Sequence, residues 1–161
     1  MIAVSDTSPL CYLVLIGQID VLHKLFDQIL APRAVLGELL HEDTPELVRS
    51  WASNLPSWII AQENPAGSAA GMEKLQLGEQ SAILLAEATQ ADIILLDEKS
   101  ARRIANDRGL RVTGTLGVLG EASTRGLVDF ALAVDRLRMT SFRCSPALLK
   151  DALERYGPRS A

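Results

Sequence analysis

The sequence lacks the features of several specialised classes of protein. Its 161 residues include two cysteines, Cys11 and Cys144, too few for a disulfide framework, and no CxxC motif or Cys/His cluster indicates a zinc site. Two Trp, two Tyr and three Phe argue against a sheet of aromatic side chains that stacks on nucleic-acid bases. The apolar run at residues 10–16 is far too short to cross a bilayer, and no basic leader precedes it. We therefore expect a cytoplasmic protein that does not bind membranes.

Common catalytic motifs are absent as well. No serine lies in a GxSxG motif, which argues against an α/β-hydrolase. The GxxxxGK[ST] and GxGxxG motifs are missing, and the glycines at residues 113–117 have the wrong spacing for a phosphate-binding loop. The two histidines, His23 and His41, lie in or near predicted helices and suggest no chemistry. The carboxylates are therefore the residues to examine.

The rest of the composition is typical of a globular protein. Hydrophobic residues make up 48% of the chain and charged residues 22%, and 11 Gly with 7 Pro are too few for a disordered or collagen-like chain. We predict a single domain over residues 1–161, with a core at about 1–120 and C-terminal helices at about 121–157. The small and polar residues 63–71 predict a surface loop inside this domain.

The net charge of −4 hides an asymmetry. Residues 1–98 carry 14 acidic and 4 basic side chains, whereas residues 99–161 carry 6 acidic and 12 basic ones. Such a division is typical of an acidic site beside a basic binding face. On charge alone, variation along a solvated surface is the plainer explanation.

Short apolar runs alternate with helical patterns along the chain. We expect strands at residues 2–5, 29–30, 58–61, 93–96 and 111–113, and helices at 9–16, 32–40, 45–54, 77–88 and 98–108, followed by three more. Ser8 is the expected N-cap of the first helix, with Pro9 at the first helical position. Strands separated by helices predict an α/β fold, a three-layer sandwich whose central parallel sheet is covered by helices. Ligands of such folds bind at the carboxyl ends of the strands.

Two aspartates follow predicted strands directly. Asp6 follows the strand at 2–5, and Asp97 follows the strand at 93–96. Each could simply cap the helix that comes next, which aspartate does well. Because the two residues occupy equivalent places in the pattern, we favour a shared site at the sheet edge.

Two glutamates lie on helices that begin near the same edge. Glu79 is in the first turn of the helix at 77–88, on a face that carries Ala82, Ile83 and Ala86. A carboxylate on an apolar face is costly unless a cation meets it. The alternative is a glutamate that bends back to solvent and interacts with the helix dipole. Glu38 repeats the pattern, and taken alone it is better explained as a solvated helix charge.

Four carboxylates at one sheet edge would repel one another and raise one another's pKa values. A divalent cation removes this repulsion. Since the ligands are oxygens without a matching Cys/His set, the expected ion is Mg²⁺ or Mn²⁺. Such ions commonly activate water and stabilise negative charge in phosphate chemistry.

Other polar residues could support this site. Thr7 or Ser8 could orient Asp6 or a bound water, although Ser8 could equally be a plain N-cap. Arg102, Asn106 and Thr113 are further supporting candidates, and Arg102, Arg103 and Arg111 could bind phosphates of a nucleic acid. A surface ion pair of Arg103 with Asp107 is the alternative for that arginine.

With these residues placed, the sequence resembles the PIN-domain family, and in particular the small prokaryotic PIN-like proteins related to VapC toxins. The similar blocks lie at residues 6–10, 32–39, 77–83, 95–103 and 109–119 and follow the family's order. The family pattern maps its acidic residues onto Asp6, Glu38, Glu79 and Asp97. The resemblance breaks at one point, because many VapC-type members have aspartate near the position of Glu79.

The resemblance implies an activity and partners. PIN proteins are typically Mg²⁺- or Mn²⁺-dependent ribonucleases, so the four carboxylates would be both metal ligands and catalytic residues in the hydrolysis of RNA. The resemblance also implies the toxin of a toxin–antitoxin pair, with RNA as substrate, an antitoxin protein as partner and a homodimer as the assembly.

Two other functions are compatible with the sequence. The unusual Glu79 and the acidic balance would suit a non-catalytic PIN-like module that binds RNA or a protein. A phosphatase or phospho-receiver also places aspartates at strand ends. However, Asp6 is followed by Thr7-Ser8 rather than by Asp-x-Asp spacing, and residues 111–117 contain no lysine.

Overall fold

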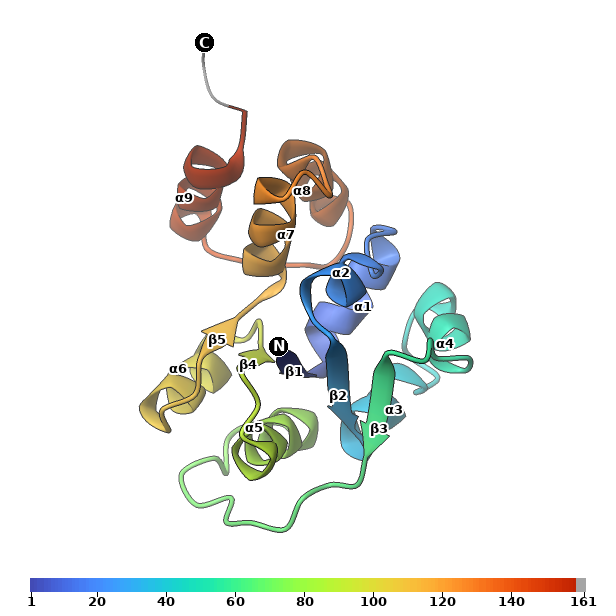
Figure 1. Cartoon of the computed structure of the whole chain (residues 1–161), viewed down its shortest axis with the longest axis vertical. Helices are drawn as coiled ribbons and strands as arrows, with labels where there is room; N and C mark the ends of the chain where they lie inside the picture. The colour runs from blue at the N-terminus through green and yellow to red at the C-terminus, as the bar shows by residue number, and fades with distance from the viewer. Residues whose placement is uncertain (159–161) are drawn as a thin grey trace.

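A parallel sheet forms the centre of the molecule (Figure 1). In the computed structural model, which describes residues 1–158, its strands are β1 (Ile2–Ser5), β2 (Gln28–Pro32), β3 (Ile59–Gln62), β4 (Ile93–Leu95) and β5 (Val112–Thr113). Their order is β3-β2-β1-β4-β5, and every neighbouring pair is parallel. The last residues of the predicted domain, 159–161, lie outside the described part of the chain.

Helices cover both faces of this sheet. On one face lie α5 (Leu77–Thr89) and α6 (Lys99–Asp107). The other face packs against α1 (Thr7–Leu15), α2 (Val21–Leu25), α3 (Arg33–Leu39), α4 (Glu46–Ala52) and α7 (Thr115–Thr124). The last two helices, α8 (Phe130–Arg138) and α9 (Pro146–Tyr156), pack on α7 at one end of the molecule (Figure 1). The predicted three-layer α/β sandwich is confirmed.

Alternation along the strands explains the two helical layers. Ala3 faces the core under α1 and α7, whereas its neighbour Val4 faces the core under α5 and α6. In β4, Ile93 and Ile94 divide in the same way. Because successive side chains of a strand point to opposite faces, a strand covered on both sides consists of apolar residues without interruption. The sequence of β4 has this composition, and β1 departs from it only at its last residue, Ser5.

Some predicted element boundaries were wrong. Ser8 is not an N-cap, because α1 begins at Thr7 and Asp6 occupies the N-cap position, without a side-chain capping bond. The Asp6 N–H donates to the Leu95 carbonyl of β4 at 3.0 Å, so the chain passes from the sheet straight into the helix. Pro32 ends β2 and precedes α3 rather than opening it. Helix α7 begins at Thr115, so residue 120 lies within this helix.

Predicted site residues lie at or near the carboxyl ends of the strands. Asp6 follows β1 directly, and Asp97 follows β4 after Leu96, the residue whose N–H donates to the Thr113 carbonyl of β5. Helix α3 begins where β2 ends and carries Glu38. Among the described residues, we find no helix that has both the length and the apolar character needed to cross a membrane.

Candidate active site

Asp6 lies at the centre of the carboxylate group. Only 4% of its surface is exposed, and its Oδ1 atom is a buried side-chain oxygen that has no hydrogen-bond partner within residues 1–158. Burial is the main cause that raises the Asp6 pKa from 3.8 to about 7, against the backbone N–H of Thr7, which lowers it. The negative charges of the other three carboxylates, those of Glu79, Glu38 and Asp97, also raise this pKa. The fold therefore brings the other three carboxylates within electrostatic range of Asp6.

Asp97 is held by the first residue of α7. The backbone N–H of Thr115 donates to Asp97 Oδ1 and its hydroxyl donates to Oδ2, both at 2.7 Å. Burial raises the pKa of Asp97, while these two hydrogen bonds and the positive charge of Arg102 lower it, and the net direction is upward. Gly114 also shapes this place, because a Cβ atom there would lie 2.8 Å from Asp97 Oδ1.

Glu38 reaches the site across the gap between α3 and α5. Its Oε2 atom accepts a hydrogen bond from the Thr7 hydroxyl, and its Oε1 atom accepts one from the Gly78 N–H at 3.1 Å. A Cβ atom on Gly78 would lie 2.6 Å from Oε1, so the carboxylate occupies space that only glycine leaves free. Glu38 is therefore not the solvated helix charge that the sequence alone favoured.

Glu79 is buried and also caps its own helix. It is buried, with 8% of its surface exposed, and its Oε1 atom accepts a hydrogen bond from the backbone N–H of Gln76 at 3.0 Å. Burial raises its pKa, with smaller contributions from the charges of Glu98 and Glu38, while the Gln76 N–H lowers it. Glu79 thus caps its own helix without turning to solvent, and its charge is felt at Asp6.

These residues match the donor chemistry of a hard cation. All four offer carboxylate oxygens, and the unpartnered oxygen of Asp6 is a donor atom that the protein itself leaves unused. As the side chains stand, no group of three or more His, Cys, Asp or Glu that could hold one metal ion occurs within residues 1–158. In both Glu38 and Glu79, at least one carboxylate oxygen already accepts a hydrogen bond from the protein.

The supporting residues predicted from sequence divide into those near the carboxylates and those elsewhere. Thr7 hydrogen-bonds Glu38 as described, whereas no hydrogen bond of the Ser8 side chain occurs in the described part of the chain. Within residues 1–158 no hydrogen bond joins Thr113 to Asp97, and the hydroxyl that donates to Asp97 is that of Thr115. The Thr113 hydroxyl instead occupies the space beside Gly117. The sequence pointed to Thr113, and only the turn at Gly114 decides which threonine faces the aspartate.

Two of the three predicted phosphate-binding arginines, Arg102 and Arg103, line a groove. It has a volume of about 1030 Å³, ends at Asp97 and is lined by Arg102, Arg103, Asn106 and Thr113, but not by Arg111. The surface ion pair of Arg103 with Asp107, the alternative role considered for this arginine, is not present within residues 1–158.

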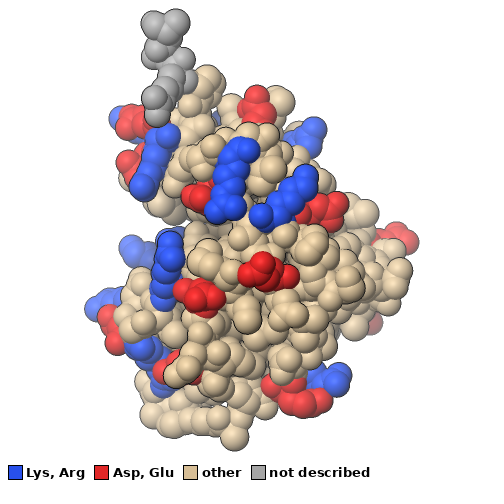
Figure 2. Space-filling view, in the orientation of Figure 1, with Lys and Arg blue, Asp and Glu red and all other residues tan. Residues whose placement is uncertain are grey.

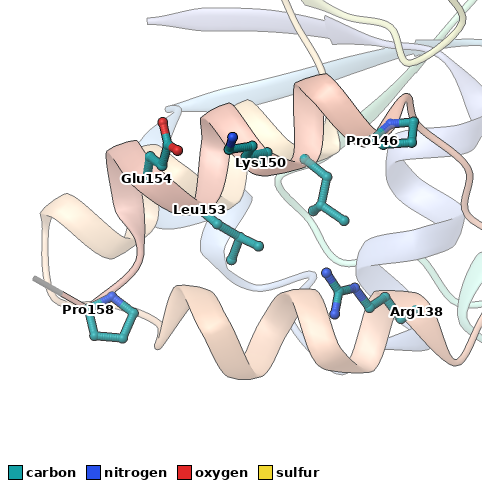
Figure 3. A pocket seen from close by; sticks show the side chains of 7 residues that line it. Arg138, Pro146, Lys150, Leu153, Glu154 and Pro158 are labelled. Atoms are coloured by element: carbon teal, nitrogen blue, oxygen red, sulfur yellow. The ribbon is translucent and has the colours of Figure 1, made fainter.

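A second hollow of about 790 Å³ lies between α8 and α9 (Figure 3). Figure 3 shows Leu153 of α9 and Arg138 of α8 in the space between the two helices. None of the predicted site residues lines this hollow, so we do not connect it with the carboxylates.

The sequence was compared with known proteins. A family model described as "DUF3368: PIN domain" matches residues 2–158. No curated protein matches the chain. The matched region includes every carboxylate and arginine of the candidate site.

Proposed function

The chain belongs to the PIN-domain family, a family of nuclease-type modules, and from this we propose that it is a divalent-metal-dependent endoribonuclease that hydrolyses phosphodiester bonds of RNA. The catalytic residues would be Asp6, Glu38, Glu79 and Asp97. Each carboxylate comes from a different helix or strand end, and the charges of the other three act on Asp6, which follows β1 at the carboxyl edge of the sheet. This edge is where parallel α/β folds bind ligands.

One observation carries the proposal. Asp6 is almost fully buried beside three other carboxylates, and one of its oxygens has no hydrogen-bond partner in residues 1–158. Burying acidic groups together without a cation is unfavourable, so a fold gains nothing from this arrangement unless a ligand uses it. A divalent cation is the ligand that carboxylate oxygens suit best.

The same four carboxylates would hold Mg²⁺ or Mn²⁺. When bound, such an ion would activate the attacking water and stabilise the charge that develops on the phosphate. The protein's own contribution is positional. Thr115 fixes both oxygens of Asp97, and Thr7 with the Gly78 N–H fixes Glu38. Arg102 lies close enough to Asp97 to lower its pKa, and its guanidinium would bind and orient the substrate phosphate.

We further propose a biological setting. The similarity to VapC-type proteins supports a toxin that is neutralised by an antitoxin protein and that acts as a homodimer. Both cysteines, Cys11 and Cys144, are free thiols, which suits the reducing cytoplasm proposed as the place of action.

The test is RNA cleavage with and without the metal. The full chain is incubated with a single-stranded RNA of mixed sequence in Mn²⁺, in Mg²⁺ or in EDTA. We expect cleavage products with the metals and none in EDTA. Intact RNA under all three conditions, from a protein that is folded by circular dichroism, would contradict the proposal.

A non-catalytic PIN-like module is the second candidate. The observation in its favour is that Glu38 and Glu79 already use oxygens in hydrogen bonds with the protein. Titration calorimetry with Mn²⁺ separates the two functions. A nuclease should bind Mn²⁺, and Asp97→Asn should weaken this binding markedly. For a non-catalytic module, Asp97→Asn should not weaken Mn²⁺ binding, and the protein should bind RNA without cleaving it.

A further inference from the structure

The groove at Asp97 has two walls from distant parts of the chain. One wall is formed by α6, β5 and the beginning of α7, and the other, here called the C-terminal wall, by residues 142–145 and helix α9. The C-terminal wall is firmly attached to the core. Gly120 of α7 leaves the space for the Tyr156 ring of α9, since a Cβ atom there would lie 2.4 Å from that ring. The groove is therefore part of the folded structure.

Arginines without ion-pair partners lie on both walls. Arg102 and Arg103 are on α6, and Arg143 and Arg155 are on the C-terminal wall. Within residues 1–158 none of these four forms an ion pair, whereas Arg108 is paired with Glu87. Figure 2 shows Lys and Arg side chains on both sides of the notch at the left edge of the molecule, over α6 and over α9. Arg143 donates to the Phe142 carbonyl at 3.1 Å, and the Arg155 guanidinium lies 5.5 Å from the centroid of the Tyr156 ring. Neither contact neutralises the charge, and guanidinium groups without ion-pair partners along one groove favour an anionic ligand with several charges.

The carboxylates of the groove do not cancel this charge. Asp97 belongs to the candidate active site. Glu98 caps α6 by accepting the Ala101 N–H at 2.9 Å, but it keeps its negative charge. Glu98, Asp107 and Asp151 therefore stand against the four arginines and Lys99. Positive charge therefore prevails along the groove once the active-site end is set apart.

Apolar side chains lie between these charges. Val112 and Leu116 line the first wall, and Phe142 and Leu148 line the C-terminal wall, where 41% of the surface of Leu148 is exposed. A ligand that fills the groove must therefore offer anions at intervals and apolar surface between them. A single strand of RNA has both, as phosphates and as sugars with unstacked bases.

We propose that the C-terminal wall is a binding site for the RNA strand beyond the phosphate that is cleaved. Arg143 and Arg155 contact backbone phosphates there, while Arg102 and Arg103 hold the strand on the opposite wall near Asp97. The inference rests on the proposed function, because it takes RNA as the substrate. It adds residues from the last part of the chain, which lies far from the four carboxylates in sequence.

Binding to RNA under non-cleaving conditions tests this inference. The probe is a fluorescein-labelled single-stranded RNA of mixed sequence, and its anisotropy is measured with the full chain in EDTA between about 50 and 200 mM salt. The variant is Arg143→Gln/Arg155→Gln. The matched control is Arg125→Gln/Arg136→Gln, which removes the same charge from exposed arginines that do not line the groove. Melting temperatures verify that both variants fold.

We expect weaker binding and a smaller salt dependence in the groove variant. Each phosphate contact on a single strand contributes roughly 0.7 to the slope of log K against log salt, so two lost contacts lower that slope by about 1.4. The control should keep the wild-type slope.

Two results would overturn the inference in distinguishable ways. If wild type and groove variant bind with the same slope and cleave RNA equally well in Mn²⁺, the C-terminal wall is not an RNA site, but the proposed nuclease stands. Its arginines would then be available to an acidic protein partner. If the wild type neither binds nor cleaves RNA, the proposed function fails together with the inference.

Discussion

The Asp6 carboxyl group ionises in a different pH range in the folded protein than in the unfolded chain. Its pKa is about 7 in the folded state, chiefly because of burial, whereas the ordinary pKa of an aspartate is 3.8. Between these two values the folded state binds more protons than the unfolded state does. The free energy of unfolding of the metal-free protein therefore falls as the pH rises through this interval.

Asp6→Asn should remove this dependence. The amide cannot ionise, so in EDTA the variant should be more stable than the wild type, and its advantage should grow from pH 4 to pH 7 and level off above. Urea unfolding at several pH values measures the difference. Asp20→Asn, at an exposed position, is the matched control and should show no such trend. A difference that stays constant with pH would contradict the raised pKa of Asp6.

Glu79 separates catalysis from helix capping. In Glu79→Gln the side-chain amide oxygen can still accept the Gln76 N–H, so the metal-free melting temperature should change little, while Mn²⁺-dependent RNA cleavage should be abolished or strongly reduced. If Glu79 acted only on the helix dipole, Glu79→Gln would instead lower the free energy of unfolding by about 0.3–1 kcal/mol and leave RNA cleavage unchanged. Glu46→Gln, in the exposed first turn of α4, is the control.

At the scale of elements, the site depends on how closely α3 approaches α5. The Glu38 carboxylate fills the space above Gly78, and the N–H of this glycine is one of its hydrogen-bond donors. A methyl group on Gly78 would meet the end of a flexible side chain, which can move away at little cost in stability. The substitution would therefore displace a candidate metal ligand without damaging the fold.

Gly78→Ala should thus leave the melting temperature unchanged or slightly higher, while it weakens Mn²⁺ binding and cleavage. The matched control is Gly37→Ala in α3, where a Cβ atom meets nothing within 4 Å. Alanine favours a helix over glycine by about 1 kcal/mol, so the control should gain stability and keep its activity. Equal activity in both variants would show that the position of Glu38 does not matter.

The elements were largely predictable from the sequence, and the contacts between them were not. The apolar runs of β1 and β4 predicted two buried strands, and therefore the places of Asp6 and Asp97 at one sheet edge. The capping role of Ser8 was predicted wrongly, because the pairing of Asp6 with Leu95 lets the helix begin two residues earlier. The Glu38–Gly78 contact joins residues 40 positions apart, and no local pattern reveals it.

At the scale of the whole molecule, the charge asymmetry of the sequence has a spatial counterpart. The acidic first part supplies the carboxylates at the sheet edge, and the basic last part supplies all four arginines of the groove. The two meet at Asp97. The sequence predicted that an acidic site and a basic face were compatible with this charge pattern, but it could not predict that α9 forms a wall of the groove.

The whole protein should be stabilised by the metal. An ion that binds only the folded state at 100 times its Kd raises the free energy of unfolding by about 2.7 kcal/mol. Melting curves of the wild type should therefore shift upward with Mn²⁺, and the shift should shrink markedly in Asp97→Asn. An identical shift in both proteins would place the ion elsewhere.

The most direct test of the central claim is the cleavage of single-stranded RNA in Mn²⁺ by the wild type, by Asp6→Asn and by Asp20→Asn. All three proteins have the same number of heavy atoms, and each variant loses one carboxylate. Asp6→Asn loses it among the four carboxylates of the candidate site, and Asp20→Asn loses it at an exposed position. If the buried carboxylates form a nuclease site, the wild type and Asp20→Asn cleave the RNA at the same rate and Asp6→Asn does not. Equal cleavage by all three proteins would contradict the account.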